Sequence, residues 1–276
     1  MKPHKPKRIG VVSKYLTPDI LEVAKQIDDF CKKNNTEVYY EKSLGRRLNS
    51  KKFLDLRNPK ADVIISIGGD GTLLKTAMAL AGKQIPIVGV RRGRMGFLAE
   101  IENDLYYYLR RIVNGDYAVE QRTKLDVKLN GKKVGEVLND AVLTTAQPGK
   151  IQKFAIEIQG NKIDEIAADG IIVATPTGST AYALSAGGPI LDPRLEAYEI
   201  VPICPFRLGI RPIAVPLNAK TALYVTSERK AMLVLDGHLS FSVSKGDKVE
   251  ITTSKSKAHL LKFEKNFYKR VKQKLI

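Results

Sequence analysis

The sequence predicts an α/β N-terminal domain, a parallel sheet with flanking helices, followed by a mostly-β C-terminal domain and a final helix that returns to the first domain. Two observations support this prediction. Up to about residue 117, short apolar runs alternate with segments of helical spacing. Beyond residue 118, apolar residues recur at every second position. We therefore expect one domain at residues 1–117, completed by 256–276, and a second at 118–255.

In the first domain, short apolar runs predict the strands. The segment between the first two is typical of a helix, because Thr17 suits the N-cap and Pro18 the first helical position. Apolar residues then follow at helical spacing as far as Cys31. Strands that are apolar almost throughout indicate a parallel sheet covered by helices. The predicted strands are Ile9–Val12, Glu37–Tyr40, Val63–Ile67 and Pro86–Val90.

In the second domain, turn residues separate short alternating strands. Asn130-Gly131 predicts a hairpin between the strand that ends at Leu129 and a return strand over 134–143. A second hairpin turns at Gly160-Asn161. Near the C-terminus, apolar residues from Leu260 to Leu275, spaced three and four apart, predict an amphipathic helix. Further predicted strands are Ile171–Ala174, Leu223–Val225, Met232–Leu235, Phe241–Val243 and Val249–Thr252.

Composition narrows the class of protein. The chain has 276 residues, 43% of them hydrophobic, which favours two globular domains over disorder. No apolar run reaches the roughly 18 residues of a membrane span, and no secretory apolar segment is present, so we expect a cytoplasmic protein without a membrane partner. Cys31, Cys204 and three scattered histidines do not have metal-ligand spacing, so we expect free buried thiols and no zinc site.

The net charge of +17 favours a polyanionic partner such as nucleic acid, a phosphorylated cofactor or polyphosphate. The densest basic run lies along the predicted C-terminal helix, where a solvated face accounts for it. No nucleic-acid-binding motif accompanies the charge. A nucleic-acid-binding protein therefore stays a low-ranked alternative, and we do not expect nucleic acid as a partner.

The most informative segment is the Gly-rich turn that follows the predicted strand Val63–Ile67. Gly68, Gly69, Asp70, Gly71 and Thr72 join this strand to a segment of helical spacing. Such a turn lets the backbone approach phosphate closely and directs N–H groups at it. A carboxylate beside phosphates is repelled unless a cation or a proton transfer requires it. Asp70 therefore indicates Mg²⁺ coordination or activation of a hydroxyl, as in phosphoryl transfer.

A second polar segment covers residues 168–190. Serine, threonine and tyrosine hydroxyls crowd there among glycines and prolines, immediately after the predicted strand Ile171–Ala174. Hydroxyls on a glycine-punctuated turn are suited to hydrogen bonding with ribose, phosphate and base edges. A Ser/Thr-rich tight turn without a ligand is the alternative interpretation.

These motifs together resemble the NAD kinase family. The matching segments are GGDGT at 68–72, Asn139-Asp140 within VLNDAV, GRMGFL at 93–98, and DGIIVATPTGSTAYALSAGGPI at 169–190. They occur in the family's order and span most of the chain. The GGDGT motif alone is shared with diacylglycerol and sphingosine kinases, so a lipid kinase remains an alternative.

The resemblance implies an enzyme that transfers a phosphoryl group from ATP or polyphosphate to the 2′-hydroxyl of the adenosine ribose of NAD. It implies Asp70 as the catalytic residue and possible Mg²⁺ ligand (another divalent cation being the alternative), and Gly68, Gly69, Gly71 and Thr72 as phosphate-binding residues. It also implies a homodimer or homotetramer with shared active sites, in which a neighbouring subunit supplies Asp169. The implied NAD-binding residues are Asn139, Asp140, Asp169, Thr177, Thr180, Tyr182 and Asp236.

The sequence departs from the family's pattern in three places. Asp140 stands where many members have Glu, which shortens its reach by one methylene. Arg91 and Arg92 stand where many members have Asn after the strand, and they suit either phosphate binding or solvation. His238 has no assigned role. Asp236-Gly237 fits a hairpin turn as well as it fits a ligand position. The sequence leaves open the phosphoryl donor, the preference for NAD or NADH, and feedback by NADP.

Overall fold

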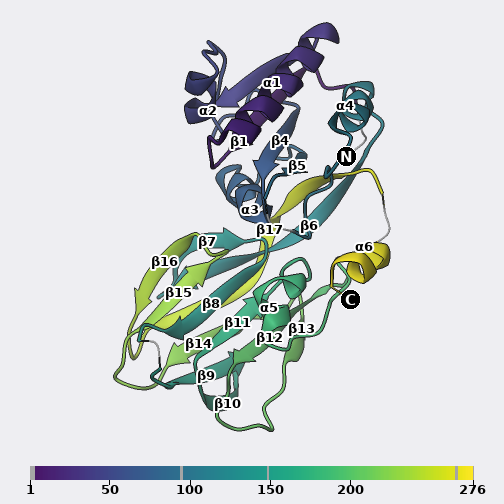
Figure 1. Cartoon of the computed structure of the whole chain (residues 1–276). Coiled ribbons are helices and arrows are strands. Elements are labelled where there is room, and N and C mark those ends of the chain that lie inside the picture. The colour runs from purple at the N-terminus through teal and green to yellow at the C-terminus, as the bar shows by residue number, and fades with distance from the viewer. Residues whose placement is uncertain (1–3, 94–95, 148, 265–266, 276) are drawn as a thin grey trace. The chain divides into compact units, whose positions relative to one another are not determined.

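The computed structural model describes residues 4–93, 96–147, 149–264 and 267–275. Two residues of the GRMGFL segment, Arg94 and Met95, lie outside this range. The chain divides into two compact units, one formed by residues 1–121 with 258–276 and the other by residues 122–257. Figure 1 traces the elements of both units, which we describe separately.

The first unit contains a parallel sheet with the strand order β3-β2-β1-β4-β5. Each of the four predicted strands is present, within two residues of its predicted bounds, and β3 was not predicted. Next to β5, the end of β17 adds a parallel partner through Leu260 and Ile87. The strands are β1 Arg8–Ser13, β2 Glu37–Glu41, β3 Phe53–Leu54, β4 Val63–Gly68 and β5 Ile87–Arg91.

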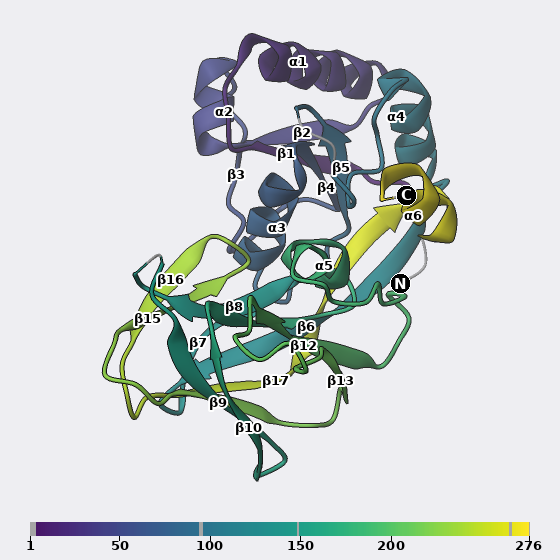
Figure 2. The same ribbon diagram turned by 60° about the horizontal axis from the view of Figure 1, so that its bottom comes forward.

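Helices cover both faces of this sheet. Helix α1 begins at Pro18 after the N-cap Thr17, as predicted, and runs along one side of the sheet (Figure 2). Its apolar face packs against Ile65 and Ile67. Helix α3 packs on the opposite face, where Leu73 approaches Gly89 of β5. The helices are α1 Pro18–Lys33, α2 Lys42–Arg47, α3 Asp70–Ala79, α4 Leu105–Asn114 and α6 Phe267–Lys274.

The final helix is shorter than predicted. Residues up to Lys262 belong to strand β17, Lys248–Lys262, and α6 is described over Phe267–Lys274. The prediction was wrong for Leu260 because residues 258–261 are all buried, as in a strand that is covered on both faces. Spacing of three and four between Leu260, Phe263 and Phe267 therefore reflects a strand and a loop rather than one helix. Helix α6 itself belongs to the first unit.

The second unit packs two largely antiparallel sheets around one apolar core, to which both contribute buried residues such as Leu125, Phe154, Ile171 and Leu233. One sheet has the order β13-β12-β11-β8-β15-β16, and its other face is covered by α5, Tyr182–Ser185. The other sheet joins β10-β9-β14-β17 and the β6–β7 hairpin. The strands are β6 Ala118–Leu129, β7 Lys132–Val137, β8 Asp140–Thr145, β9 Gln152–Ile158, β10 Asn161–Ala168, β11 Gly170–Ala174, β12 Ala197–Ile203, β13 Ile213–Pro216, β14 Thr221–Val225, β15 Ala231–Leu235 and β16 Leu239–Val243.

Two expectations for this half of the chain need correction, and two of its strands were not predicted. The return strand over 134–143 is two strands, β7 and β8, in different sheets, because the backbone bends at Leu138 and Asn139. Strands β12 and β13 were not predicted. Cys204 is exposed rather than buried, whereas Cys31 is buried as expected. Among the described residues, no helix has both the length and the apolar character that a membrane span requires.

Candidate functional site

The Gly-rich turn lies between β4 and α3, at the carboxyl end of the parallel sheet. Gly68 has a φ of +147°, and a Cβ there would lie 2.6 Å from the Thr72 hydroxyl oxygen. Glycine is therefore required at this position. Gly69 is the N-cap of α3, and Asp70 is its first residue. The motif therefore forms the N-terminus of α3, where backbone N–H groups can bind phosphate.

The Asp70 carboxylate is held by a second segment of the first unit. One of its oxygens accepts a hydrogen bond from the Phe97 N–H at 2.6 Å, and both accept from the Leu98 N–H at 3.1 Å. Gly96 approaches so closely that a Cβ there would lie 2.4 Å from an Asp70 oxygen. The end of the GRMGFL segment therefore fixes the orientation of this carboxylate.

Arg91 and Arg92 follow β5 beside the same turn. The Arg92 N–H donates to the Gly68 carbonyl at 3.2 Å, which ties the two strand ends together. The Arg92 guanidinium donates to the Arg91 carbonyl at 2.8 Å, and the Arg91 guanidinium lies 3.4 Å from Glu102. Both cations are partly buried at the carboxyl edge of the sheet, where the phosphates of a ligand on this turn would lie.

In the second unit, Asp236 organises the bend that carries Asn139 and Asp140. Its carboxylate accepts from the N–H groups of Leu138, Asn139 and Asp140 at 2.8, 2.8 and 3.0 Å. Asp236 lies in the β15–β16 hairpin turn, so it serves a turn and an interaction at once. Burial raises the pKa of Asp236, and its three N–H bonds oppose the rise. Burial and the nearby Asp236 raise the pKa of Asp140 to about 7.

The threonine-rich turn packs directly on this bend. The Thr175 N–H donates to the Asn139 carbonyl at 2.8 Å, and a Cβ on Gly178 would lie 2.1 Å from the same oxygen. Thr177 is buried and accepts a hydrogen bond from Arg122 at 3.3 Å, and the Thr180 hydroxyl donates to the Thr177 carbonyl at 3.2 Å. The structure therefore brings Asn139, Asp140, Thr177, Thr180 and Asp236 together.

The side-chain oxygen of Asn139 is buried without a hydrogen-bond partner among the residues that the structure describes. A buried acceptor of this kind costs free energy unless a donor reaches it. Because this atom lies on the bend against which the threonine-rich turn packs, it is suited to a ligand that donates a hydrogen bond, such as a ribose hydroxyl or an adenine amino group.

Tyr182 and Asp169 lie differently from this group. Tyr182 begins α5, two residues beyond Thr180, and its side chain is 47% exposed. Asp169 precedes β11, whereas the threonine-rich turn follows the same strand. Six residues of extended chain from Asp169 to Thr175 span roughly 20 Å. Within one chain, Asp169 therefore lies at the opposite end of β11 from Asn139.

Several residues around these positions were not predicted from the sequence. Arg122 was overlooked, although a cation within an alternating strand was a visible signal. Glu199, fully buried on β12, was also missed, although it interrupts an apolar run. The N–H groups of Phe97 and Leu98 leave no side-chain signal, so no pattern pointed to their bonds with Asp70.

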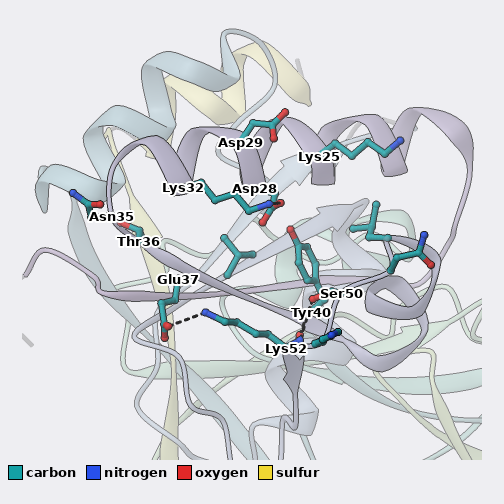
Figure 3. Close-up of a pocket in the computed structure, with 14 residues that line it drawn as sticks. Lys25, Asp28, Asp29, Lys32, Asn35, Thr36, Glu37, Tyr40, Ser50 and Lys52 are labelled. Atoms are coloured by element: carbon teal, nitrogen blue, oxygen red, sulfur yellow. Dashed lines mark hydrogen bonds and ion pairs between the residues drawn. The ribbon is translucent and has the colours of Figure 1, made fainter.

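A cavity of about 680 Å³ lies elsewhere in the first unit, between α1, β2 and the residues that precede β3. Figure 3 shows Lys52 reaching Glu37, at 2.7 Å, while Tyr40 points toward Asp28 on α1. None of the predicted site residues lines it. Among the described residues, no group of three or more His, Cys, Asp or Glu side chains is placed to hold a metal ion.

Family models that match this chain describe ATP-NAD kinase domains, and curated relatives that match it are NAD kinases. The ATP-NAD kinase N-terminal domain matches residues 9–117, and the ATP-NAD kinase C-terminal domain matches residues 138–263. The NAD kinase of Methanothermobacter thermautotrophicus is 39% identical over 98% of this chain and 96% of its own length. That of Methanosphaera stadtmanae is 37% identical over 98% and 99%.

Two solved structures share the fold. An NAD kinase from Archaeoglobus fulgidus in complex with ATP is 30% identical, with a TM-score of 0.80, over 96% of this chain and 98% of that one. Yeast NADH kinase in complex with NADH, at 21% identity, has a TM-score of 0.86 over 96% and 85%. Nothing in these comparisons supports a lipid kinase or a nucleic-acid-binding protein. The resemblance is confirmed, and the chain belongs to the NAD kinase family.

Proposed function

We propose that this chain transfers the γ-phosphoryl group of ATP to the 2′-hydroxyl of the adenosine ribose of NAD, which yields NADP. The observation that carries the proposal is the Asp70 carboxylate, fixed at the start of α3 on a Gly-rich turn, in a chain of this family. Phosphoryl transfer requires positioning and charge stabilisation more than covalent chemistry. A rigid carboxylate beside a phosphate-binding backbone meets both requirements.

Asp70 would orient the attacking hydroxyl or accept its proton. The N–H groups at Gly69 and Gly71 would bind phosphate oxygens, assisted by the dipole of α3. The Thr72 N–H donates to the Gly69 carbonyl at 3.0 Å, so Thr72 would shape the turn rather than bind phosphate through its backbone. Arg91 and Arg92 would add positive charge beside the same phosphates. ATP is the donor that the Archaeoglobus structure favours, and polyphosphate is the alternative donor.

A magnesium ion, or another divalent cation, fits this site with one protein ligand. Mg²⁺ keeps several waters and binds nucleotides through one or two carboxylates together with substrate phosphates. Asp70 is a single carboxylate at the phosphate turn, so it would hold the ion jointly with the triphosphate. The ion would neutralise charge on the transferred group, and Asp70 would still fix the position of the hydroxyl.

The dinucleotide would bind at the threonine-rich turn of the second unit. Asn139 and Asp140 would contact the ribose and adenine, because the Asn139 amide oxygen is buried there without a partner among the described residues. Thr177, Thr180 and Tyr182 would line the same pocket. Asp236 would act mainly by holding the backbone of Asn139 and Asp140 in place.

We further propose a homodimer or homotetramer, working in the cytoplasm, in which Asp169 of one subunit completes the site of another. The separation of Asp169 from Asn139 along β11 supports this arrangement, since one chain does not bring them together.

A matrix of donors and acceptors tests the proposed function. Purified protein would be assayed with ATP, other triphosphates and polyphosphate against NAD, NADH and diacylglycerol, with Mg²⁺ present or chelated. Mass spectrometry would identify the product. We expect NADP from ATP and NAD in the presence of Mg²⁺. Phosphorylated lipid without NADP, or no phosphorylation of NAD with any donor, would overturn the proposal.

A further inference from the structure

We propose that Arg270, on the last helix, is a positioning residue for Asp70. Arg270 fixes the peptide segment whose N–H groups hold the Asp70 carboxylate. The inference rests on the proposed function, because it assigns a task to residues around the reacting carboxylate. It concerns only contacts within the first unit.

Arg270 and Asp70 hold the same residues from two sides. The Arg270 Nη1 group donates to the carbonyl oxygens of Phe97 and Ala99 at 3.0 and 3.4 Å. The N–H group of Phe97 donates in turn to the Asp70 carboxylate at 2.6 Å. The rings of Phe97 and Phe267 meet edge to face at 5.7 Å, so α6 contacts the side chain as well as the backbone.

The guanidinium of Arg270 is itself fixed. Its Nη2 group lies 2.5 Å from Glu100, whose side chain is only 3% exposed. Glu100 also pairs with Lys262 at 2.6 Å, at the end of β17. Charged hydrogen bonds in so buried a setting are stronger than neutral ones and hold a defined geometry. Arg270 is therefore a rigid link between the sheet and the segment at residues 97–99.

A second cation on the same helix holds the preceding peptide. Lys274 donates to the Gly96 carbonyl and pairs with Glu102 at 2.6 Å. Gly96 is the residue that lies against the Asp70 oxygen. Arg270 and Lys274, one turn apart on α6, thus form hydrogen bonds with the carbonyl groups of consecutive peptides whose N–H groups face the carboxylate. Without these hydrogen bonds the Phe97 and Leu98 N–H groups could move. A shift of about 1 Å at a reacting group can lower the rate by up to a hundredfold.

The test compares Arg270→Lys with Lys272→Ala. Arg270→Lys keeps a cation beside Glu100, so the buried ion pair persists, but it loses the fork that reaches both Glu100 and the carbonyls. Lys272→Ala removes a charge from an exposed position of the same helix. We expect Arg270→Lys to lower kcat by about tenfold or more, while KM for ATP and NAD and the melting temperature stay near wild type. Lys272→Ala should change none of them.

Two further measurements separate positioning from a structural role. Hydrogen exchange of the Phe97 and Leu98 amides, measured without substrates, should be faster in Arg270→Lys and unchanged in Lys272→Ala. In the double variant Asp70→Asn/Arg270→Lys, the loss in kcat should not exceed that of Asp70→Asn alone, because Arg270 acts through Asp70.

The outcomes distinguish the two proposals. A wild-type protein without NAD kinase activity contradicts the proposed function, and the exchange experiment still tests the contact network. With active wild type, a folded Arg270→Lys variant whose kcat is within twofold of wild type overturns the inference. Losses that multiply in the double variant overturn it as well.

Discussion

Replacing Glu199 with Gln should make the stability of this protein less sensitive to pH. The Glu199 side chain is fully buried on β12, and neither carboxylate oxygen has a hydrogen-bond partner among the described residues. Gly188 covers it so closely that a Cβ there would lie 3.1 Å from an oxygen. Burial raises the pKa of Glu199 from 4.5 to about 7, since the charged form is poorly solvated there.

Proton binding determines the direction in which the stability changes with pH. Between the pKa of the unfolded chain and that of the folded protein, the folded state keeps the proton and the unfolded state has lost it. The contribution of the protonated Glu199 to the free energy of unfolding is therefore fully present below about pH 4.5, and it is lost as the pH rises toward 7. The rise in the pKa of Glu199 from 4.5 to about 7 corresponds to roughly 3 kcal/mol of unfolding free energy, most of it lost between pH 5 and pH 8. The amide introduced by Glu199→Gln does not titrate, so this variant should escape the loss.

Urea unfolding of both proteins at pH 5 and pH 8 measures the effect. The difference in unfolding free energy, variant minus wild type, should rise by about 2–3 kcal/mol between the two pH values. Titrations of Asp140 and Asp236 cancel in this difference. Glu196→Gln, at an exposed neighbouring position, is the matched control for the loss of one carboxylate. A difference that changes by less than about 0.5 kcal/mol would mean that the Glu199 carboxylate is solvated or has a hydrogen-bond partner, and would refute the reasoning.

Three further predictions address the site. Asp70→Asn should lower kcat by roughly a hundredfold or more while leaving NAD affinity near wild type, and near-normal turnover of the folded variant would remove Asp70 from the chemistry. Asn139→Ala should weaken NAD binding by about 1–3 kcal/mol in calorimetry, with a smaller change for ATP, because ligand groups lose a partner. Gly178→Ala should weaken NAD binding at least as much as Asn139→Ala does, with a corresponding rise in the KM for NAD, since its Cβ would collide with the Asn139 carbonyl. An unchanged KM would place the dinucleotide away from this turn.

Local signals in the sequence were sufficient for most of the fold. Strand β4, the glycines after it and helix α3 follow one another directly, so the turn at Asp70 could be predicted from adjacent residues. The β9–β10 hairpin was equally local, because Gly160-Asn161 marks its turn. Strand β12 has no such marker, since it combines Glu199 and Pro202 with apolar residues. Long-range pairing with β11 and β13 makes it a strand, and no pattern within the segment indicates that pairing.

The interactions at the site that were not predicted have the same origin. The Gly-rich turn indicated Asp70 and the resemblance supplied Asn139, but neither showed what holds these residues in place. Asp70 is fixed by backbone N–H groups 27 and 28 residues away, and Asn139 by a carboxylate 97 residues away. Backbone donors carry no signature in a sequence. The bend that splits β7 from β8 depends on Asp236 for the same reason, so predicting a single strand there followed naturally from the apolar alternation.

The placement of Asp169 makes a shared active site testable. Asp169 lies about 20 Å along β11 from the start of the turn that carries Thr177, so we expect a neighbouring chain to supply the Asp169 that acts at a given dinucleotide. Inactive Asp70→Asn and Asp169→Asn proteins would be mixed after dissociation and allowed to reassemble, with a mass-tagged protomer to confirm exchange. In a hybrid, one site combines an intact Asp70 from one subunit with an intact Asp169 from the other, so part of the activity should return. Exchanged hybrids that stay inactive, or full activity in a monomer by light scattering, would reject the shared site and leave Asp169 as a polar residue at a strand end.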